Sequence, residues 1–197
     1  LRPIERQACI YCNKASLYGL THPGCWRNKG VDGHISLFHY DNLLKKIIKG
    51  IKYSFVTAAR NDLFYLIAKY GQEPLIYYKK NPKLFIQPIP LSKEKEESRG
   101  FNQAEMMAGT FSLLTNIKEI EMIRRHKNTE IQAKIKNKQK RRENMKSAFS
   151  LIGKQIRAKE ILLVDDVVTS GSTVKEAAKT LKRGGVEKVY AFSVAKG

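Results

Sequence analysis

One stretch decides the fold that we predict for this chain: Ile161-Leu162-Leu163-Val164-Asp165-Asp166-Val167-Val168-Thr169-Ser170-Gly171-Ser172-Thr173. Its four leading aliphatic residues predict a strand buried on both faces, which is typical of a parallel sheet. Two adjacent carboxylates follow, and then a loop of small hydroxyl residues around Gly171. After the loop we predict a helix that ends at Gly184-Gly185, because apolar residues recur at helical spacing: Val174, Ala177, Ala178 and Leu181.

The order of strand, acid pair, loop and helix predicts a binding site for a sugar phosphate. Backbone N–H groups at the start of a helix have no intrahelical partner, and the helix dipole favours an anion there. Gly171 allows close approach because it lacks a Cβ, and the neighbouring hydroxyls add donors. The two carboxylates would repel a phosphate, so we assign them to ribose hydroxyls or to Mg²⁺. The predicted site residues are Asp165, Asp166, Val167, Thr169, Ser170, Gly171, Ser172 and Thr173.

This stretch resembles the phosphoribosyl-pyrophosphate (PRPP) binding loop of the type I phosphoribosyltransferases, with hydrophobic residues, two acids, Thr, Gly and Thr in the same order. The resemblance implies that the ligand is PRPP or a related ribose 5-phosphate, and that Mg²⁺ accompanies PRPP. The alternative is an ordinary βα turn with a capping Thr and a surface acidic pair. Neither G-x-x-x-x-G-K-[ST] nor G-x-G-x-x-G after a strand occurs in the sequence.

Composition points to a globular protein with a polyanionic partner. The chain has 197 residues and 42% hydrophobic content, enough for one packed domain and a small appendage. Its net charge of +19 indicates an extended polyanion or an anionic membrane surface nearby, although a generally basic proteome would give the same bias. We find neither an apolar run of the roughly 20 residues that span a bilayer nor a secretory signal. We therefore expect a cytoplasmic location, free or peripheral at the inner face of the cytoplasmic membrane.

Four residues near the N-terminus predict a structural metal site. Cys9-x-x-Cys12 and His22-x-x-Cys25 form two short-spaced pairs, the arrangement of a zinc knuckle, and Cys₃His is a normal tetrahedral set for Zn²⁺. Because protein side chains would fill all four positions, we assign the Zn²⁺ a structural role. The prediction divides the chain into a zinc-binding module at 1–30 and a larger domain at 31–197. The alternative is three unrelated thiols and a surface histidine.

Two basic segments are candidates for DNA binding. Residues 41–68 are predicted as one helix with an apolar face and with lysines on its other faces. Residues 124–146 hold ten Lys or Arg against Glu130 and Glu143, which predicts a long mobile loop or an exposed basic helix. The predicted DNA contacts are Lys45, Lys49, Lys52, Arg124, Arg125, Lys138, Lys140, Arg141 and Arg142. The alternatives are a solvated basic face for the first segment and a closing catalytic lid for the second.

A second βα turn is predicted in the first half of the chain. Leu84-Phe85-Ile86 predicts a strand that the following prolines end, and residues 104–114 predict a helix. In the phosphoribosyltransferases the equivalent turn holds the pyrophosphate, so the resemblance assigns Leu91 and Arg99 to that group. The turn also carries acids whose charge opposes pyrophosphate binding, Glu94, Glu96 and Glu97.

Taken together, these motifs resemble the ComF family of competence proteins. The resemblance covers nearly the whole chain and rests on the metal-ligand pairs, the 161–173 stretch and further motifs: Pro88-Ile89-Pro90-Leu91, Arg99-Gly100-Phe101-Asn102-Gln103, Thr129-x-x-Gln132, Arg141-x-x-Asn144 and Ala148-Phe149. The zinc motif of the family is usually all cysteine, and His22 departs from it. The resemblance implies a type I phosphoribosyltransferase-like α/β fold, with a parallel sheet flanked by helices. It also implies a role in natural transformation, handling incoming single-stranded DNA alongside a ComF-type helicase and other competence proteins.

Two classes of function remain open. In the first, the protein is a competence factor that binds single-stranded DNA and retains a PRPP site. In the second, it is a metabolic phosphoribosyltransferase that joins a base or an amine to ribose 5-phosphate. The basic surplus favours the first, and the intact phosphate loop keeps the second open. No residue of the sequence identifies the acceptor or a general base, so we leave enzymatic activity open.

Overall fold

A sheet of four parallel strands lies at the centre of the protein, whose computed structural model describes residues 1–28, 30–53, 57–71, 77–78, 80–126, 147–153 and 158–197. The order of the strands is β1-β6-β5-β2. Their bounds are Gly33–His39 for β1, Leu84–Pro88 for β2, Glu160–Val168 for β5 and Lys188–Lys196 for β6. Parallel neighbours need crossover connections, so the predicted α/β class is confirmed.

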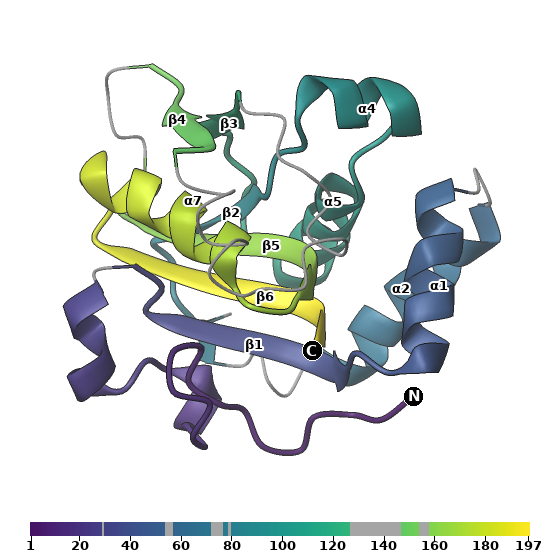
Figure 1. Cartoon of the computed structure of the whole chain (residues 1–197), viewed down its shortest axis with the longest axis horizontal. Helices are drawn as coiled ribbons and strands as arrows, with labels where there is room; N and C mark the ends of the chain where they lie inside the picture. The colour runs from purple at the N-terminus through teal and green to yellow at the C-terminus, as the bar shows by residue number, and fades with distance from the viewer. Residues whose placement is uncertain (29, 54–56, 72–76, 79, 127–146, 154–157) are drawn as a thin grey trace.

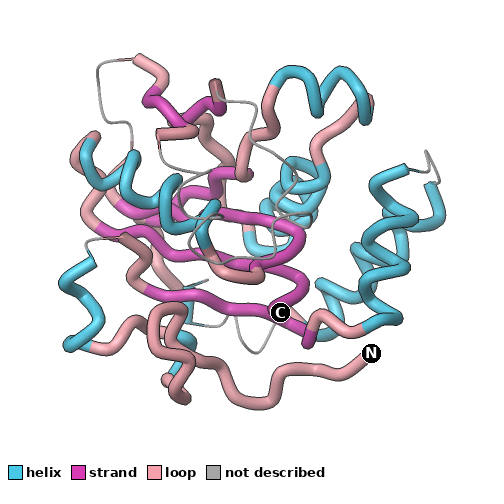
Figure 2. Tube along the Cα trace, in the orientation of Figure 1, coloured by secondary structure: helices cyan, strands magenta, loops and turns pink. Residues whose placement is uncertain are grey.

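Helices cover both faces of this sheet (Figures 1 and 2). α7 (Ser172–Arg183) lies in front of the sheet in Figure 1, and α5 (Gln103–Thr115) lies behind it. α1 (Asn42–Tyr53) packs against α2 (Thr57–Tyr70), which in turn contacts α5. The other described elements are the short helix α4 (Lys93–Arg99), the antiparallel pair β3 (Ile123–Arg125) and β4 (Phe149–Leu151), and the 3₁₀ turns η1 (Leu17–Gly19) and η2 (Pro23–Asn28). Among the described helices, none combines the length and apolar composition that crossing a bilayer requires.

The strand β5 buries both of its faces, as its aliphatic run predicted. Ile161 and Leu163 join one apolar cluster with residues of α7, Val174, Ala177 and Leu181. The alternate residues Leu162 and Val164 join a second cluster with residues of α5, Met107 and Phe111. Successive side chains of a strand point to opposite faces, so a strand with a helix on each side needs an unbroken aliphatic run.

Two predicted boundaries are wrong. The helix predicted over 41–68 is two helices, α1 and α2, which pack side by side. A single helix of that length would extend about 40 Å, whereas the two shorter helices pack against each other and α2 also contacts α5. The strand predicted at 161–164 extends to Val168, because the backbone of β5 still pairs with β6 at Asp165 and Val167. The acid pair is therefore part of the strand and does not follow it.

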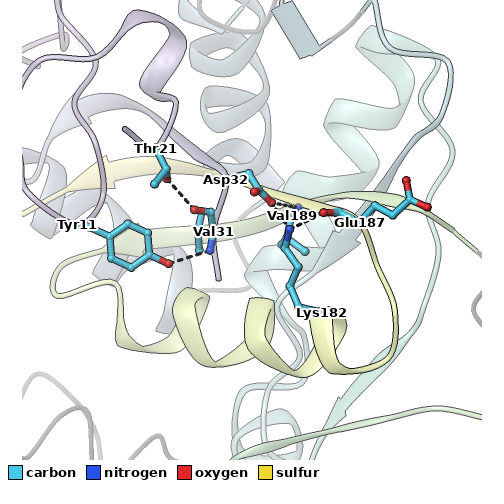
Figure 3. A network of polar contacts seen from close by, with 7 residues as sticks. All are labelled: Tyr11, Thr21, Val31, Asp32, Lys182, Glu187 and Val189. Atoms are coloured by element: carbon cyan, nitrogen blue, oxygen red, sulfur yellow. Dashed lines mark hydrogen bonds and ion pairs between the residues drawn. The ribbon is translucent and has the colours of Figure 1, made fainter. Parts of the chain in front are cut away.

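The segment before β1 is held to the body of the protein by the polar network of Figure 3. The N–H of Val31 donates to the Tyr11 hydroxyl at 2.9 Å. Asp32 Oδ2 accepts a hydrogen bond from the N–H of Val189 at 2.7 Å and lies 2.6 Å from Lys182 Nζ. The N-terminal segment thus meets the start of β6 and the end of α7.

Candidate functional site

The loop between β5 and α7 is a compact turn at the carboxyl edge of the sheet, where open α/β sheets bind their ligands. Gly171 is the N-cap of α7 and has a left-handed φ of 70°. Lys175, in the first turn of α7, donates from Nζ to the carbonyl oxygen of Ser170 at 3.2 Å. The other predicted residues flank the glycine on both sides: Thr169, Ser170, Ser172 and Thr173. Backbone N–H groups, hydroxyls and one ammonium therefore gather at a helix N-terminus, which suits a phosphate.

The predicted acid pair lies in β5, just ahead of this loop. Asp165 Oδ1 accepts a hydrogen bond from the N–H of Asp166 at 2.9 Å. Asp166 Oδ1 likewise accepts from the N–H of Val167 at 2.8 Å. Both side chains are half-buried, and these bonds fix their direction. Carboxylates fixed in this way suit ribose hydroxyls or a hydrated Mg²⁺ next to the phosphate loop.

The turn between β2 and α5 lies at the same edge, because β2 and β5 are parallel neighbours. The N–H of Ile89 donates to the carbonyl oxygen of Val164 at 2.9 Å. Asn102 caps α5: its Oδ1 accepts from the N–H of Ala104 at 3.0 Å, and its Nδ2 donates to the carbonyl oxygen of Ile89 at 3.2 Å. The two ends of the turn are therefore tied together.

Between those ends the predicted turn contains the helix α4. Glu94 and Glu96 lie in its first turn and Arg99 in its last, the charge order that a helix dipole favours. Gly100 follows with a left-handed φ of 73°, a common helix ending. Leu91 precedes α4, and both predicted pyrophosphate residues are partly buried.

Two guanidinium groups, those of Arg99 and Arg125, lie within electrostatic reach of each other at this edge. Arg99 Nη1 donates to Gln103 Oε1 at 3.1 Å. Arg125, on β3, lies within electrostatic reach of Asp165 and Arg99: burial lowers the pKa of its guanidinium, Asp165 opposes that effect and Arg99 adds to it. Gln87 supports β3, because its Oε1 accepts from the N–H of Met122 at 2.6 Å. The start of β3 is thereby tied to the end of β2.

The four predicted metal ligands are brought together. The ligand atoms of Cys9, Cys12, His22 and Cys25 all lie within 4.8 Å of one another, so the cluster could hold a metal ion. His22 Nδ1 lies 3.3 Å from Cys12 Sγ, and His22 Nε2 lies 3.1 Å from the carbonyl oxygen of Ala15. A proton on Nε2 would satisfy that carbonyl and leave Nδ1 as the lone-pair donor, which is the usual arrangement of a histidine that binds a metal.

The charge state of the thiols also fits a metal. Burial raises the pKa of the Cys9 thiol, but N–H donors of Cys12, His22 and Tyr11 outweigh it and bring that pKa down to about 7. Burial and the two neighbouring thiols raise the pKa of Cys25 to about 11. Three sulfurs so close together resist full ionisation unless a cation compensates them, and Zn²⁺ supplies that charge in Cys₃His sites.

The predicted DNA contacts fall on separate parts of the protein. Lys45 and Lys49 are exposed on α1, and Lys52 lies in the same helix. Arg124 is exposed on β3, whereas its neighbour Arg125 is partly buried, with its guanidinium 5.7 Å from the centre of the Phe149 ring and within electrostatic reach of Asp165. In Figure 1, α1 and β3 lie well apart, with α4 and α5 between them. The other predicted contacts lie outside the described residues: Lys138, Lys140, Arg141 and Arg142.

Sequence reasoning missed two cations of this edge. Lys175 lies one helical turn after Gly171. Its role could have been predicted, because it is a basic residue in the first turn of a helix that follows a phosphate loop. The sequence assigns Arg125 to the basic run because it is one of ten basic residues within 124–146, and no local pattern separates it from Arg124. Because both arginines lie in β3, which pairs with β4, their side chains point to opposite faces of that pair.

A parallel sheet with a phosphate loop and an acid pair at its carboxyl edge defines the class of the protein as phosphoribosyltransferase-like. The sequence profile of the phosphoribosyl transferase domain matches residues 102–197, which include α5, β5, the loop and α7.

Curated relatives give the family. The chain is 30% identical to Competence protein F of Haemophilus influenzae over 196 residues, covering 95% of this chain and 84% of that protein. It is 26% identical to Competence protein ComFC of Bacillus subtilis, covering 98% of this chain and 80% of that protein. DNA utilization protein YhgH of Escherichia coli O157:H7 is 34% identical, covering 53% of this chain and 45% of that protein. This chain belongs to the ComF family of competence proteins, as the resemblance predicted.

Proposed function

We propose that this protein is a competence factor that handles incoming single-stranded DNA during natural transformation and that retains a site for PRPP. The observation that carries the proposal is near full-length similarity to competence proteins in a chain that keeps an intact phosphate loop. A net charge of +19 supports a polyanionic partner. The relatives named for DNA utilization support nucleic acid as that polyanion.

In this proposal the loop and the acid pair bind PRPP. Thr169 to Thr173 take the 5′-phosphate, and Asp165 and Asp166 take the ribose hydroxyls with Mg²⁺ assisting. Arg99 and Arg125 face the pyrophosphate from the neighbouring turn. Residues 1–30 form a zinc-binding module with one structural Zn²⁺ per chain on Cys9, Cys12, His22 and Cys25. Elemental analysis of protein purified without added metal tests the last point, with about one equivalent expected.

The proposed DNA surface combines α1 with the 124–146 run. Neutralised phosphates release counterions, so affinity for single strands should fall by about 0.7 log units per log unit of salt for each contact. We place the protein in the cytoplasm, with a ComF-type helicase and other competence proteins as partners. A peripheral position at the inner face of the cytoplasmic membrane would use the same basic surface, since anionic lipids attract lysine clusters.

The test is a DNA titration with two matched quadruple variants. Replacing Lys138, Lys140, Arg141 and Arg142 with Ala should weaken binding equally for unrelated sequences and flatten the salt slope. The control removes the same charge at the amino edge of the sheet, from four exposed residues: Lys80, Lys83, Arg183 and Lys188. If both variants weaken binding equally, the DNA has no defined path over the 124–146 run, and that assignment fails.

The second candidate is a metabolic phosphoribosyltransferase, and the two arginines beside the acid pair favour it. A panel of nucleobases and amines with PRPP and Mg²⁺, assayed for released pyrophosphate, distinguishes the two functions. In the transferase, the 124–146 quadruple variant would lose turnover with PRPP and keep its DNA affinity. In the competence factor, the same variant would lose DNA affinity and keep its PRPP affinity, and the wild type would release no pyrophosphate with any nucleobase or amine.

A further inference from the structure

The two residues between the first pair of metal ligands contact the phosphate loop. Ile10 is 6% exposed and belongs to the apolar cluster of α7. A Cβ placed on Gly171 would lie 3.2 Å from Ile10 Cδ1 and 3.3 Å from Ile10 Cγ1. The backbone of the loop therefore rests directly on the Ile10 side chain, and the left-handed glycine allows that approach.

Tyr11 contacts the cation of the same loop. Lys175 Nζ lies 4.9 Å from the centre of the Tyr11 ring and donates to the carbonyl oxygen of Ser170 at 3.2 Å. The aromatic ring thus holds the ammonium that spans the loop. The Tyr11 hydroxyl accepts from the N–H of Val31 at 2.9 Å, which fixes the other end of the ring (Figure 3).

Cys9 and Cys12 of the metal cluster flank Ile10 and Tyr11 in the sequence. Two backbone hydrogen bonds close the turn that holds them: the N–H of Asn13 donates to the Cys9 carbonyl at 2.9 Å, and the N–H of Cys9 donates to the Lys14 carbonyl at 3.0 Å. Binding a metal orders such short ligand turns. The ion pair between Asp32 and Lys182 also links the N-terminal segment to α7, but it does not involve the metal ligands.

We propose that the metal-bound Cys9–Cys12 turn positions the 5′-phosphate loop through Ile10 and Tyr11, so that metal loading sets the affinity for a ribose 5-phosphate ligand. Both are positioning residues that act through Gly171 and Lys175. The inference rests on the proposed sugar-phosphate site and adds a second role for the metal. The metal would position the phosphate loop as well as stabilise the zinc-binding module. By linkage, the ligand must tighten the metal by the same factor.

Ribose 5-phosphate is the probe for the first test. It lacks the pyrophosphate that Mg²⁺ bridges, so a chelator that removes Zn²⁺ does not also remove a required Mg²⁺. Removing the Zn²⁺ should lower the calorimetric affinity about tenfold or more, and added Zn²⁺ should restore it where Mg²⁺ does not. Saturating ribose 5-phosphate should slow the release of Zn²⁺ to a colorimetric chelator, a readout that needs no activity.

Variants then separate positioning from stability. Tyr11→Leu should weaken ribose 5-phosphate binding by roughly threefold to tenfold, the range of a cation–π contact, with one equivalent of Zn²⁺ still bound. Ile10→Ala should weaken it at least as much. Ile35→Ala is the matched control, because Ile35 is a buried isoleucine, 1% exposed, in the other apolar cluster. It should lower the melting temperature and leave the affinity unchanged. Tyr11→Leu combined with Lys175→Met should weaken binding no more than Lys175→Met alone.

The outcomes separate this inference from the proposed function. If the zinc-loaded wild type does not bind ribose 5-phosphate, the proposed site and this inference both fail. If the wild type binds it, and the metal-free protein, Ile10→Ala and Tyr11→Leu bind it equally well, the inference alone is overturned. If Ile10→Ala loses Zn²⁺ or does not fold, Tyr11→Leu and the chelation experiment decide. An affinity lost equally in Ile35→Ala would assign the effect to global stability and would also overturn the inference.

Discussion

Two βα turns lie side by side at the carboxyl edge of the sheet, and they are built differently. The β5–α7 turn runs from Thr169 to Gly171 and offers hydroxyls, backbone N–H groups and Lys175. The β2–α5 turn runs from Ile89 to Asn102 and contains the helix α4. Three exposed glutamates and three basic residues lie in α4. The groups of the first turn suit a phosphate, whereas the charges of the second turn balance one another.

For the proposed site, the difference predicts unequal binding of the sugar phosphate and the pyrophosphate. A phosphate at the N-terminus of α7 would meet backbone N–H groups, hydroxyls and Lys175. A pyrophosphate at the second turn would lie near Arg99 but also in the field of the α4 acids. We therefore predict tighter binding of the ribose phosphate than of the pyrophosphate.

The largest effect should come from the acid pair. Asp165→Ala combined with Asp166→Ala removes the proposed partners of the ribose hydroxyls and of Mg²⁺, so PRPP affinity should fall by about a hundredfold or more, as expected when several hydrogen bonds to charged groups are lost together. The melting curve should stay near that of the wild type, because both side chains are half-buried at the sheet edge. Titration calorimetry measures the affinity. An unchanged value in the double variant would remove these two residues from the site.

The two turns each contain a left-handed glycine, which allows a matched comparison. Gly171→Ala and Gly100→Ala both force alanine into φ near +70°, at φ values of 70° and 73°, and each should cost about 1 kcal/mol of stability. Gly171→Ala also places a Cβ 3.2 Å from Ile10 Cδ1, within the proposed phosphate loop, whereas Gly100 lies in the other turn. We therefore expect Gly171→Ala alone to weaken the binding of ribose 5-phosphate, by about tenfold or 1.4 kcal/mol. Equal affinities in the two variants would mean that the β5–α7 turn does not bind the phosphate.

Adjacent arginines test the second turn. Arg125→Met should weaken PRPP by roughly fivefold, the range of a screened charge contact, and leave ribose 5-phosphate unchanged, because its guanidinium faces Asp165 and Arg99. Arg124→Met is the control, since Arg124 is exposed one residue away and should affect DNA binding only. Fluorescence titrations with both ligands and a labelled oligonucleotide measure the pattern. If Arg125→Met weakens DNA and spares PRPP, Arg125 belongs to the basic run, as the sequence first predicted.

The smallest effect is expected from the acids of α4. Replacing Glu94, Glu96 and Glu97 with Gln should strengthen PRPP binding by about twofold to threefold, with no change for ribose 5-phosphate, because exposed charges interact weakly through water. The gain should disappear in high salt, where the screening length is short. A calorimetric series from low to high salt checks it, and a gain that persists in high salt would argue for a direct contact in place of a field effect.

The parts of this protein that depend on local pattern can be predicted from its sequence. The aliphatic run Ile161 to Val164 predicted a strand covered on both sides, and the spacing of Val174, Ala177 and Leu181 predicted the helix α7. The spacing of Cys9, Cys12, His22 and Cys25 gave the metal cluster, because two tight pairs bring four soft ligands within reach of one ion. A phosphate site at the glycine-containing start of α7 is likewise predicted from neighbouring residues, and it stays a prediction.

How distant segments meet depends on the folded structure. Arg125 looks like any member of a basic run, but in the fold it lies within electrostatic reach of Asp165, and Ile10 looks like a spacer between ligands until it lies under Gly171. The 41–68 segment divides into α1 and α2, which pack on each other while α2 also contacts α5. The physical reason is range: strand and helix periods and ligand spacing act within a few residues, whereas packing and burial depend on residues that only folding brings together.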